Sequence, residues 1–573
     1  MTAASGGTAT SAPGPTTMCA AFQATAGRVP DAVALRTVGG ATSYTWSEYA
    51  TRVHAIAAGL AALGVSHGDT VALLLTNRPE FHLFDTAAQH LGAVPFSCYY
   101  SSSPEQIDYL LAASGARVAI TERRLAGLLT CATSSPRHLV VIDGEPQPPV
   151  LSLDALVAAG RPDFDLDRSI RAVRPDDLLT LVYTSGTTGP PKGVEITHAG
   201  MVAMVTASAP VLGMRAGDRL ISFLPSAHIA DRWANHYLHS WTGTEVTTLA
   251  DPREILGALL DVRPTLFGGV PQVWQRLVAG VGRMVAARPE LRQAIDLGHR
   301  YQQARRAGVV PPGLAAAYRA VDERALSAIR TQLGLDRVRL AITAAAPAPP
   351  AVVEFVTALG IPLSEAWGMS ELSGMATMNP PDAIRPGTVG LPLPGVEVRV
   401  AADGELLVRG PMMMRGYRDR PDETAAVLDA DGWLSTGDIA GVDADGYLSI
   451  VDRKKELLIT SGGENVAPAL VELAIKTHCP QVSQAVVAGD SRPYLVALLV
   501  LDPEADGDVT AAVEAGMRAA NATLSRAEQV RAYEIVTDPW PPGGELVTPT
   551  MKVRRGPVLR AYADRIESLY AER

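Results

Sequence analysis

Apolar and polar positions in the N-terminal part of the chain alternate between a helical and an extended period. From residue 44 to residue 64 the apolar positions follow helical spacing, and Thr45 with Glu48 forms a capping box at the start of this segment. The continuous apolar run Thr70–Thr76 follows. Because strands that are covered on both faces are apolar throughout, this run predicts a buried strand after a helix.

The same cycle then repeats. A second helical segment ends at Gly92, and an apolar strand follows it. Ser103 and Gln106, with Pro104 between them, open another helix, which precedes the extended segment 116–121. A chain that alternates helices with buried strands in this way predicts an α/β domain built on a parallel sheet.

Two later regions depart from this alternation. Residues 278–335 are rich in Ala, Arg, Gln and Glu and contain one Pro-Pro break at Pro311, which predicts a helical insertion. From about Glu397 the segments become short and extended, and Asp-Gly pairs within 428–433 and 442–447 favour tight turns. We therefore expect a smaller β-rich region there.

The C-terminal segment 453–573 has the size of a separate compact α+β domain. Two extended segments, 484–489 and 494–502, predict a pair of strands joined by a turn. We place the domain boundary at 453–455, after a large N-terminal domain of residues 18–452.

Length, charge and cysteine content restrict the class of protein. With 573 residues the chain is too long for a single hydrophobic core. The net charge of −10 disfavours nucleic acid as the main partner, because proteins that bind it carry a concentrated basic surface. The cysteines form no CxxC pair, which is typical of neither a disulfide framework nor a zinc site and favours a reducing cytoplasm; they are Cys19, Cys98, Cys131 and Cys479.

The N-terminus and the apolar segments carry no sign of export or of a membrane span. Residues 1–17 are mostly small, lack the basic and apolar regions of a secretory signal, and are expected to form a disordered tail. The most apolar stretches, such as 494–501, are much shorter than the ~20 residues that a membrane helix needs. Peripheral contact with a membrane stays open.

The segment 181–198, LVYTSGTTGPPKGVEITH, has the composition of a phosphate-binding loop. An apolar strand enters a loop of glycines and hydroxyl residues that ends in a lysine, so that N–H groups, hydroxyls and an ammonium group can surround a triphosphate. The residues concerned are Thr184, Ser185, Gly186, Thr187, Thr188, Gly189 and Lys192. The common P-loop is excluded, because Pro191 and Gly193 flank the lysine where that motif needs Gly and Ser or Thr. A mobile surface turn is the plainer alternative, and this composition after an apolar strand disfavours it.

This string resembles the signature of the acyl-adenylate-forming (AMP-binding) superfamily of acyl-CoA synthetases, luciferases and peptide-synthetase adenylation domains. The resemblance extends from about residue 44 to residue 555, and it is greatest for the long-chain fatty acid–CoA ligase branch. It implies a large N-terminal α/β domain with stacked sheets and a β-rich subdomain, followed by a small, mobile C-terminal α+β domain. It also implies that ATP, Mg²⁺ and coenzyme A take part in the reaction.

The segment EAWGMSE, Glu365–Glu371, resembles the aromatic-Gly-x-Thr-Glu motif of this family. The resemblance implies that Trp367 flanks the adenine and that Glu371 binds magnesium together with Thr184. A carboxylate suits this role, because a hard cation prefers oxygen ligands.

Neighbouring positions depart from the family pattern. Gly368 keeps the motif glycine, whereas Ser370 stands where threonine is usual and preserves the hydroxyl group. Both are expected to contact the nucleotide. Alanines at 344–346 fall in a nucleotide-contacting turn that the family builds from glycines, so no residue is assigned there.

Four charged residues toward the C-terminus complete the set that the resemblance implies. Asp438 ends the sequence STGD and would accept hydrogen bonds from the ribose hydroxyls. Arg453 would reach the same ribose, and Lys455 would be the hinge about which the small domain turns. Lys552 falls where the family keeps a lysine that is essential for adenylation. In isolation each would be a solvated charge or a turn residue; the series favours the functional interpretation.

The segment FLPSAHIADR, 223–232, resembles a motif of the fatty-acyl branch and places His228 beside the acyl pocket and the phosphates. A zinc site formed by His228, His236 and His239 is disfavoured, because their spacing matches no standard site. A domain that activates amino acids is disfavoured as well, since only Asp231 is a candidate to hold an ammonium group.

The sequence therefore predicts an AMP-forming acyl-CoA synthetase that makes acyl-AMP from a fatty acid and transfers the acyl group to coenzyme A. Two alternatives stay open: transfer to an acyl carrier protein, and a catalytically silent nucleotide- or acyl-binding protein. The acyl chain length and the oligomeric state, monomer or homodimer, are not determined by the sequence.

Overall fold

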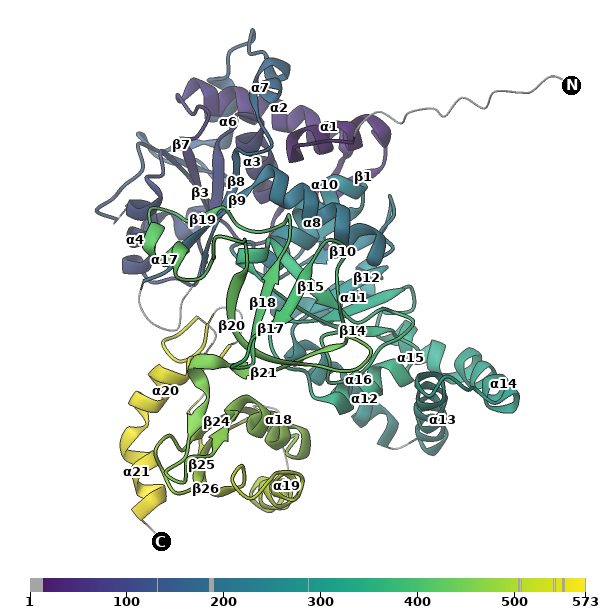
Figure 1. Ribbon diagram of the computed structural model, residues 1–573. Helices are drawn as coiled ribbons and strands as arrows, with labels where there is room; N and C mark the ends of the chain where they lie inside the picture. The colour runs from purple at the N-terminus through teal and green to yellow at the C-terminus, as the bar shows by residue number, and fades with distance from the viewer. Residues whose placement is uncertain are drawn as a thin grey trace, which may run out of the picture.

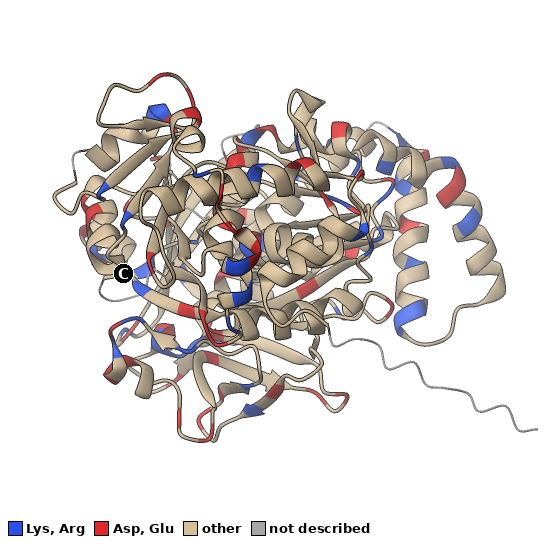
Figure 2. Ribbon diagram, turned by 90° about the horizontal axis from the view of Figure 1, so that it is seen from above, with Lys and Arg blue, Asp and Glu red and all other residues tan. Residues whose placement is uncertain are grey.

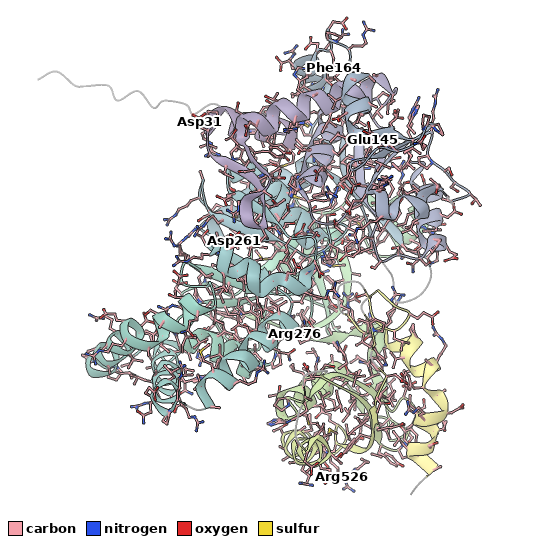
Figure 3. All side chains as sticks on the ribbon, turned by 180° about the vertical axis from the view of Figure 1, so that it is seen from behind. Asp31, Glu145, Phe164, Asp261, Arg276 and Arg526 are labelled. Atoms are coloured by element: carbon pink, nitrogen blue, oxygen red, sulfur yellow. The ribbon has the colours of Figure 1, made fainter. Side chains whose placement is uncertain are left out.

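The computed structural model describes residues 14–130, 132–184, 190–286, 288–502, 505, 508–538, 540–541, 543–548 and 552–571. A large N-terminal part holds most of the sheets, and a smaller C-terminal part lies against one end of it (Figure 1). Seen from behind, Phe164 of the large part and Arg526 of the small part lie at opposite ends of the molecule (Figure 3).

An eight-stranded sheet lies at the centre of the first α/β region. In spatial order its strands are β19 (Gly416–Tyr417), β9 (Lys192–Thr197), β8 (Leu178–Thr184), β4 (Val94–Ser97), β3 (Thr70–Leu74), β5 (Val118–Thr121), β6 (His138–Val141) and β7 (Leu151–Ser152). The strands from β8 to β7 run parallel, which confirms the predicted parallel sheet. Strands β9 and β19 add an antiparallel edge that the sequence did not predict.

Helices cover this sheet and the one beside it. They are α1 (Met18–Arg28), α2 (Trp46–Ala62), α3 (Pro79–His90), α4 (Pro104–Ser114), α5 (Ala126–Thr130), α6 (Leu153–Ala158), α7 (Leu166–Ala172), α8 (His198–Val211), α9 (Ile229–Asp231), α10 (Leu238–Thr242) and α11 (Ile255–Val262). Both predicted capping boxes are present, since Thr45 with Glu48 opens α2 and Ser103 with Gln106 opens α4. Thr17 is buried and caps α1, so the predicted tail is wrong at its last residue.

Three further sheets complete the large part. The first has the order β10 (Arg219–Ser222), β11 (Glu245–Thr248), β1 (Val33–Thr37) and β2 (Ser43–Thr45); the second has β12 (Leu266–Gly269), β13 (Leu340–Thr343), β14 (Leu363–Met369), β15 (Gly374–Met378) and β16 (Leu391–Pro392). The third is the expected β-rich region, with β17 (Glu397–Val400), β18 (Glu405–Arg409), β20 (Leu434–Val442) and β21 (Leu448–Arg453), all antiparallel.

The predicted insertion is helical, and it begins earlier than expected. Its helices are α12 (Pro271–Ala286), α13 (Pro289–Arg306), α14 (Pro312–Val321) and α15 (Ser327–Gln332), and α16 (Pro350–Ala358) follows β13. Helix α12 starts at Pro271 rather than Val278. Its first turns bury Trp274 and Leu277 in a hydrophobic cluster that also contains Val353 of α16. Seen from above, α13 and α14 project to one side, and charges of both signs are scattered over the molecule (Figure 2).

The C-terminal part is an α+β unit. Its elements are β22 (Leu458–Ile459), β23 (Asn465–Val466), α18 (Pro468–His478), β24 (Val482–Ala488), β25 (Leu495–Leu501), α19 (Val509–Thr523), β26 (Val530–Val536), α20 (Arg555–Ala561) and α21 (Ala563–Ala571). Strands β24 and β25 are antiparallel neighbours, as predicted. Among the described helices, none is both long enough and apolar enough to cross a membrane.

The packing of α13 on α16 predicts a local effect on stability. A Cβ atom at Gly298 would lie 2.2 Å from the carbonyl oxygen of Ala358, so Gly298→Ala must push the two helices apart. We expect a loss of ~1–3 kcal/mol, measured by urea denaturation followed by circular dichroism. The control is Gly282→Ala on α12, where a Cβ meets nothing within 4 Å and should stabilise the helix by up to ~1 kcal/mol. Equal midpoints for the two variants would contradict this packing.

Candidate active site

The two ends of the glycine-rich loop are fixed by a β-hairpin. Thr184 ends β8 and Lys192 begins β9, and these two residues are paired across the hairpin. The loop residues predicted to bind phosphate between them, Ser185, Gly186, Thr187, Thr188 and Gly189, lie outside the described residues. The hairpin thus delivers Thr184 and Lys192 to the same edge of the sheet.

Lys192 is held between a carboxylate and an aromatic ring. Its Nζ lies 2.6 Å from Oε2 of Glu423, in helix α17 (Pro421–Ala425), and 4.8 Å from the ring centre of Tyr417 on β19. The sequence analysis missed both partners, because they lie more than two hundred residues away from the loop. The run GYRDRPDET, 416–424, was the available signal, but it was not linked to any chemistry.

The motif residues Trp367 to Glu371 span the end of β14 and the start of the turn that leads to β15. Gly368 sits at a bulge where an added Cβ would lie 2.0 Å from the carbonyl oxygen of Gly374, so a side chain would break the pairing. Ser370 and Glu371 follow in a short 3₁₀ turn, η6 (Ser370–Leu372), and are both buried. The hydroxyl group of Tyr417 donates to Oε1 of Glu371 over 2.8 Å. The same tyrosine therefore contacts both Glu371 and Lys192.

The turn at 344–346 keeps the geometry for which a glycine is suited. Ala345 has a φ of 75°, in the left-handed region that L-residues with a Cβ rarely adopt. The backbone at Ala345 thus adopts a conformation that a glycine would adopt more readily.

Asp438 is buried, and its carboxylate is the centre of the site. Oδ2 accepts a 2.9 Å hydrogen bond from Nε1 of Trp367, and Oδ1 lies 2.8 Å from Nε of Arg453, the residue paired with it on β21. Burial raises the pKa of Asp438, while Arg453, Trp367 and Lys552 act in the opposite direction. The predicted adenine and ribose residues are therefore in direct contact.

The charge of Lys552, in the C-terminal segment, acts on this carboxylate. The backbone of this lysine is held by Thr548, whose N–H donates to the carbonyl oxygen of Lys552 over 2.8 Å. The pKa of the Lys552 ammonium is lowered, first by desolvation and then by Arg453, while Asp438 acts in the opposite direction. Part of the residue is still exposed, so a ligand can reach it although protein surrounds it.

The charge of the same lysine acts on His228. This histidine caps the short helix α9, where its Nδ1 accepts the backbone N–H of Ala230 over 3.1 Å. Burial, reinforced by the charge of Lys552, lowers the pKa of His228 to about 3. The ring is therefore neutral at physiological pH, and because Nδ1 is the acceptor, Nε2 carries the proton and can donate it to a substrate oxygen.

A buried ion pair fixes the segment after His228. Arg232 begins a π-helical turn, η3 (Arg232–Tyr237), and its guanidinium group donates to the carboxylate of Asp85 on α3. Oδ1 of Asp85 also lies 3.0 Å from Nε2 of His236. Breaking such a buried pair by removing one partner costs about 3–5 kcal/mol, so the pair holds η3 firmly against α3.

Asp231 is committed to internal hydrogen bonds. Its carboxylate, fully buried, accepts from the Ser222 hydroxyl over 3.0 Å and from the Asn235 amide over 2.7 Å. Burial raises its pKa to about 7. The one acidic residue considered as a partner for a substrate ammonium group is thus occupied, which further disfavours an amino acid as substrate.

The predicted hinge residue, Lys455, has a neighbour on one side that contacts the large domain and a neighbour on the other side that contacts the small domain. Lys454 is 2.6 Å from Asp403 and 2.7 Å from Glu405, both in the β-rich sheet region. Glu456 is 3.5 Å from Arg555 on α20. Lys455, exposed, stands between these two attachments in the turn η7 (Lys454–Glu456).

The donor set around Glu371 fits magnesium. The described residues contain no group of three or more His, Cys, Asp or Glu side chains that could hold a metal by themselves. Magnesium bound with ATP needs only one or two protein oxygens, because phosphates and water supply the rest. The carboxylate of Glu371 and the hydroxyl group of Thr184, the two predicted ligands, would supply such oxygens.

Comparison with known proteins follows the same division of the chain. The AMP-binding enzyme family matches residues 22–418, and the AMP-binding enzyme C-terminal domain family matches residues 455–573. A protein named as a fatty-acid–CoA ligase, fadD11 of Mycobacterium tuberculosis, is 46% identical over 451 residues, 74% of this chain and 79% of the relative. The long-chain-fatty-acid–CoA ligase FadD15 of Mycobacterium bovis is 35% identical over 92% of both chains.

Solved structures share the fold. The anthranilate CoA ligase AuaEII in complex with anthranoyl-AMP has a TM-score of 0.78 at 22% identity, over 96% of this chain and 98% of that chain. The O-succinylbenzoate coenzyme A synthetase MenE from Bacillus subtilis, in complex with ATP and magnesium, has a TM-score of 0.69 at 24% identity, over 94% and 98% of the two chains. The chain belongs to the AMP-binding enzyme family.

Proposed function

We propose that this chain is an ATP-dependent acid–thiol ligase that activates a long-chain fatty acid as acyl-AMP and transfers the acyl group to coenzyme A. The observation that carries the proposal is the contact of Trp367 and Arg453 with the buried carboxylate of Asp438, on which the charge of Lys552 acts from the C-terminal segment. The names of the relatives, which are fatty-acid–CoA ligases, support this choice of acid and acceptor.

In the first step, a carboxylate oxygen of the acid attacks the α-phosphorus of ATP, and the bond from that phosphorus to the pyrophosphate oxygen breaks. Two anions must approach each other, so the site has to supply positive charge and fixed donors. Lys552 supplies an ammonium group and His228 a neutral N–H. Because His228 stays neutral, it can donate a hydrogen bond to a substrate oxygen without repelling the ammonium group of Lys552.

The nucleotide is held by the buried carboxylate and its partners. Asp438 would accept the ribose hydroxyls, since Arg453 and Trp367 fix both of its oxygens in place. The indole of Trp367 would then lie beside the adenine. Lys192 and the hydroxyl groups of the loop would face the β- and γ-phosphates. When bound, magnesium neutralises charge on the departing pyrophosphate, and Glu371 and Thr184 would hold it.

In the second step, the thiol of coenzyme A loses its proton and attacks the acyl carbon, and AMP leaves. Lys552 has no further task at the anhydride, so a different surface can replace it. Rotation about Lys455 would withdraw Lys552 and bring the exposed turn at 461–463 toward the thiol. Lys454 contacts the large domain and Glu456 contacts the small one, which supports Lys455 as the point of rotation.

The compartment and the acceptor are part of the proposal. In the described part of the chain Cys19, Cys98 and Cys479 are buried free thiols, and burial raises the pKa of Cys98 to about 12 and that of Cys479 to about 11. Such thiols are suited to the reducing cytoplasm, where we place the enzyme.

An acyl carrier protein as acceptor would use the same nucleotide ligands, so only a direct assay separates it from coenzyme A.

The proposal predicts the products of a substrate series. Purified protein with MgATP, coenzyme A and acids from short to long chain should release AMP and form thioester, with the highest kcat/KM for long chains. Products are measured by chromatography with mass detection. Pyrophosphate release without thioester would shift the acceptor to a carrier protein; no product with any acid would favour a silent binding protein.

The hinge predicts that the two steps can be separated. Proline at position 455 fixes φ near −65° and restricts the preceding residue, so Lys455→Pro should block rotation. We expect ATP–pyrophosphate exchange to remain and thioester formation to fall about tenfold or more, about 1.4 kcal/mol in barrier. Lys455→Ala, which leaves the backbone free, is the control and should keep both activities. Equal loss of both steps in the proline variant would refute the hinge.

A further inference from the structure

A second carboxylate, Glu423, is connected to the metal-binding residue through a row of contacts. Tyr417 donates to Glu371 over 2.8 Å, and the ammonium group of Lys192 lies 4.8 Å from the centre of the same ring. The same ammonium group lies 2.6 Å from Oε2 of Glu423. Lys192 is thus held by an aromatic face and by an anion before any phosphate is present.

Glu423 has a second cation of its own. Arg420 donates to its other oxygen, and Nη2 of Arg420 lies 3.2 Å from the hydroxyl group of Tyr109. Tyr109 in turn donates to the carbonyl oxygen of Pro191 over 2.9 Å, next to the lysine. Contacts with Lys192 first, and with Arg420, lower the pKa of Glu423. The carboxylate therefore stays charged and keeps a partner when Lys192 moves away.

The pair is open to solvent and can exchange. The side chains of Lys192 and Glu423 are 28% and 34% exposed, and Glu423 and Arg420 line a solvent-open cavity of about 620 Å³ together with Tyr109 and Gly193. An ion pair of this kind contributes little, because water screens it. The buried pair of Arg232 with Asp85 has no such freedom.

We propose that Glu423 is a positioning residue that holds Lys192 in the ATP-free enzyme and gives it up to the β- and γ-phosphates in each turnover. The inference rests on the proposed role of Lys192 as a phosphate ligand. Glu423 neutralises the lysine before ATP binds and again when pyrophosphate leaves. Glu423 therefore weakens the binding of ATP and of pyrophosphate to the same extent, and it favours the release of pyrophosphate.

The test is Glu423→Gln, which keeps the shape and removes the charge. We expect the KM for MgATP and the inhibition constant of pyrophosphate each to fall about 1.5- to 5-fold, the range that exposed ion pairs provide. The value of kcat should not rise, because the change affects ground-state binding. Glu397→Gln is the matched control: it removes the same charge from an exposed pair with Arg409 and should change neither constant.

Two further variants separate this inference from the proposed function. Lys192→Met should impair ATP–pyrophosphate exchange, and in that background Glu423→Gln should no longer lower either constant. If Lys192→Met has no effect, the phosphate role of the lysine is wrong. If it impairs exchange while Glu423→Gln alone leaves the constants unchanged or raises them, the lysine role stands and the role of Glu423 is refuted.

Discussion

The arrangement of the site depends on one buried carboxylate that must keep its charge. A carboxylate removed from water is costly unless cations and hydrogen-bond donors surround it. Asp438 receives Arg453 from the neighbouring strand, Trp367 from β14, and the field of Lys552 from the C-terminal segment. Three separate parts of the chain are thereby directed to one point, and each is a group that the nucleotide would contact.

The partners of Asp438 differ in how firmly they are held. Arg453 and Trp367 belong to sheets of the large domain, so they remain when the small domain moves. Lys552 belongs to the small domain, which is joined to the large domain through the segment that contains Lys455. A site with two fixed ligands and one removable ligand can keep the nucleotide while the reacting acyl group changes its surroundings. This is what a reaction with two different nucleophiles requires.

Local signals in the sequence predicted local structure well. Thr45 with Glu48 and Ser103 with Gln106 identified helix starts, because a capping box is complete within four residues. The helical insertion was predicted from Val278, whereas α12 begins at Pro271 and continues into it. Long-range pairs could not be predicted from local patterns. Asp85 with Arg232, and Lys192 with Glu423, join segments that no motif links. The residues implied by the family resemblance, such as Asp438 with Arg453, were found because recurring motifs carry that long-range information.

The claim that Lys552 serves the first step and not the second can be tested by measuring the two half-reactions of Lys552→Ala separately. ATP–pyrophosphate exchange with a fatty acid reports adenylation, and thioester formation from synthetic acyl-AMP and coenzyme A reports transfer. The account predicts that exchange is lost, by about two orders of magnitude or more (~3 kcal/mol), while transfer from acyl-AMP stays near that of the unaltered enzyme. Loss of transfer together with exchange, or exchange that survives, would contradict it.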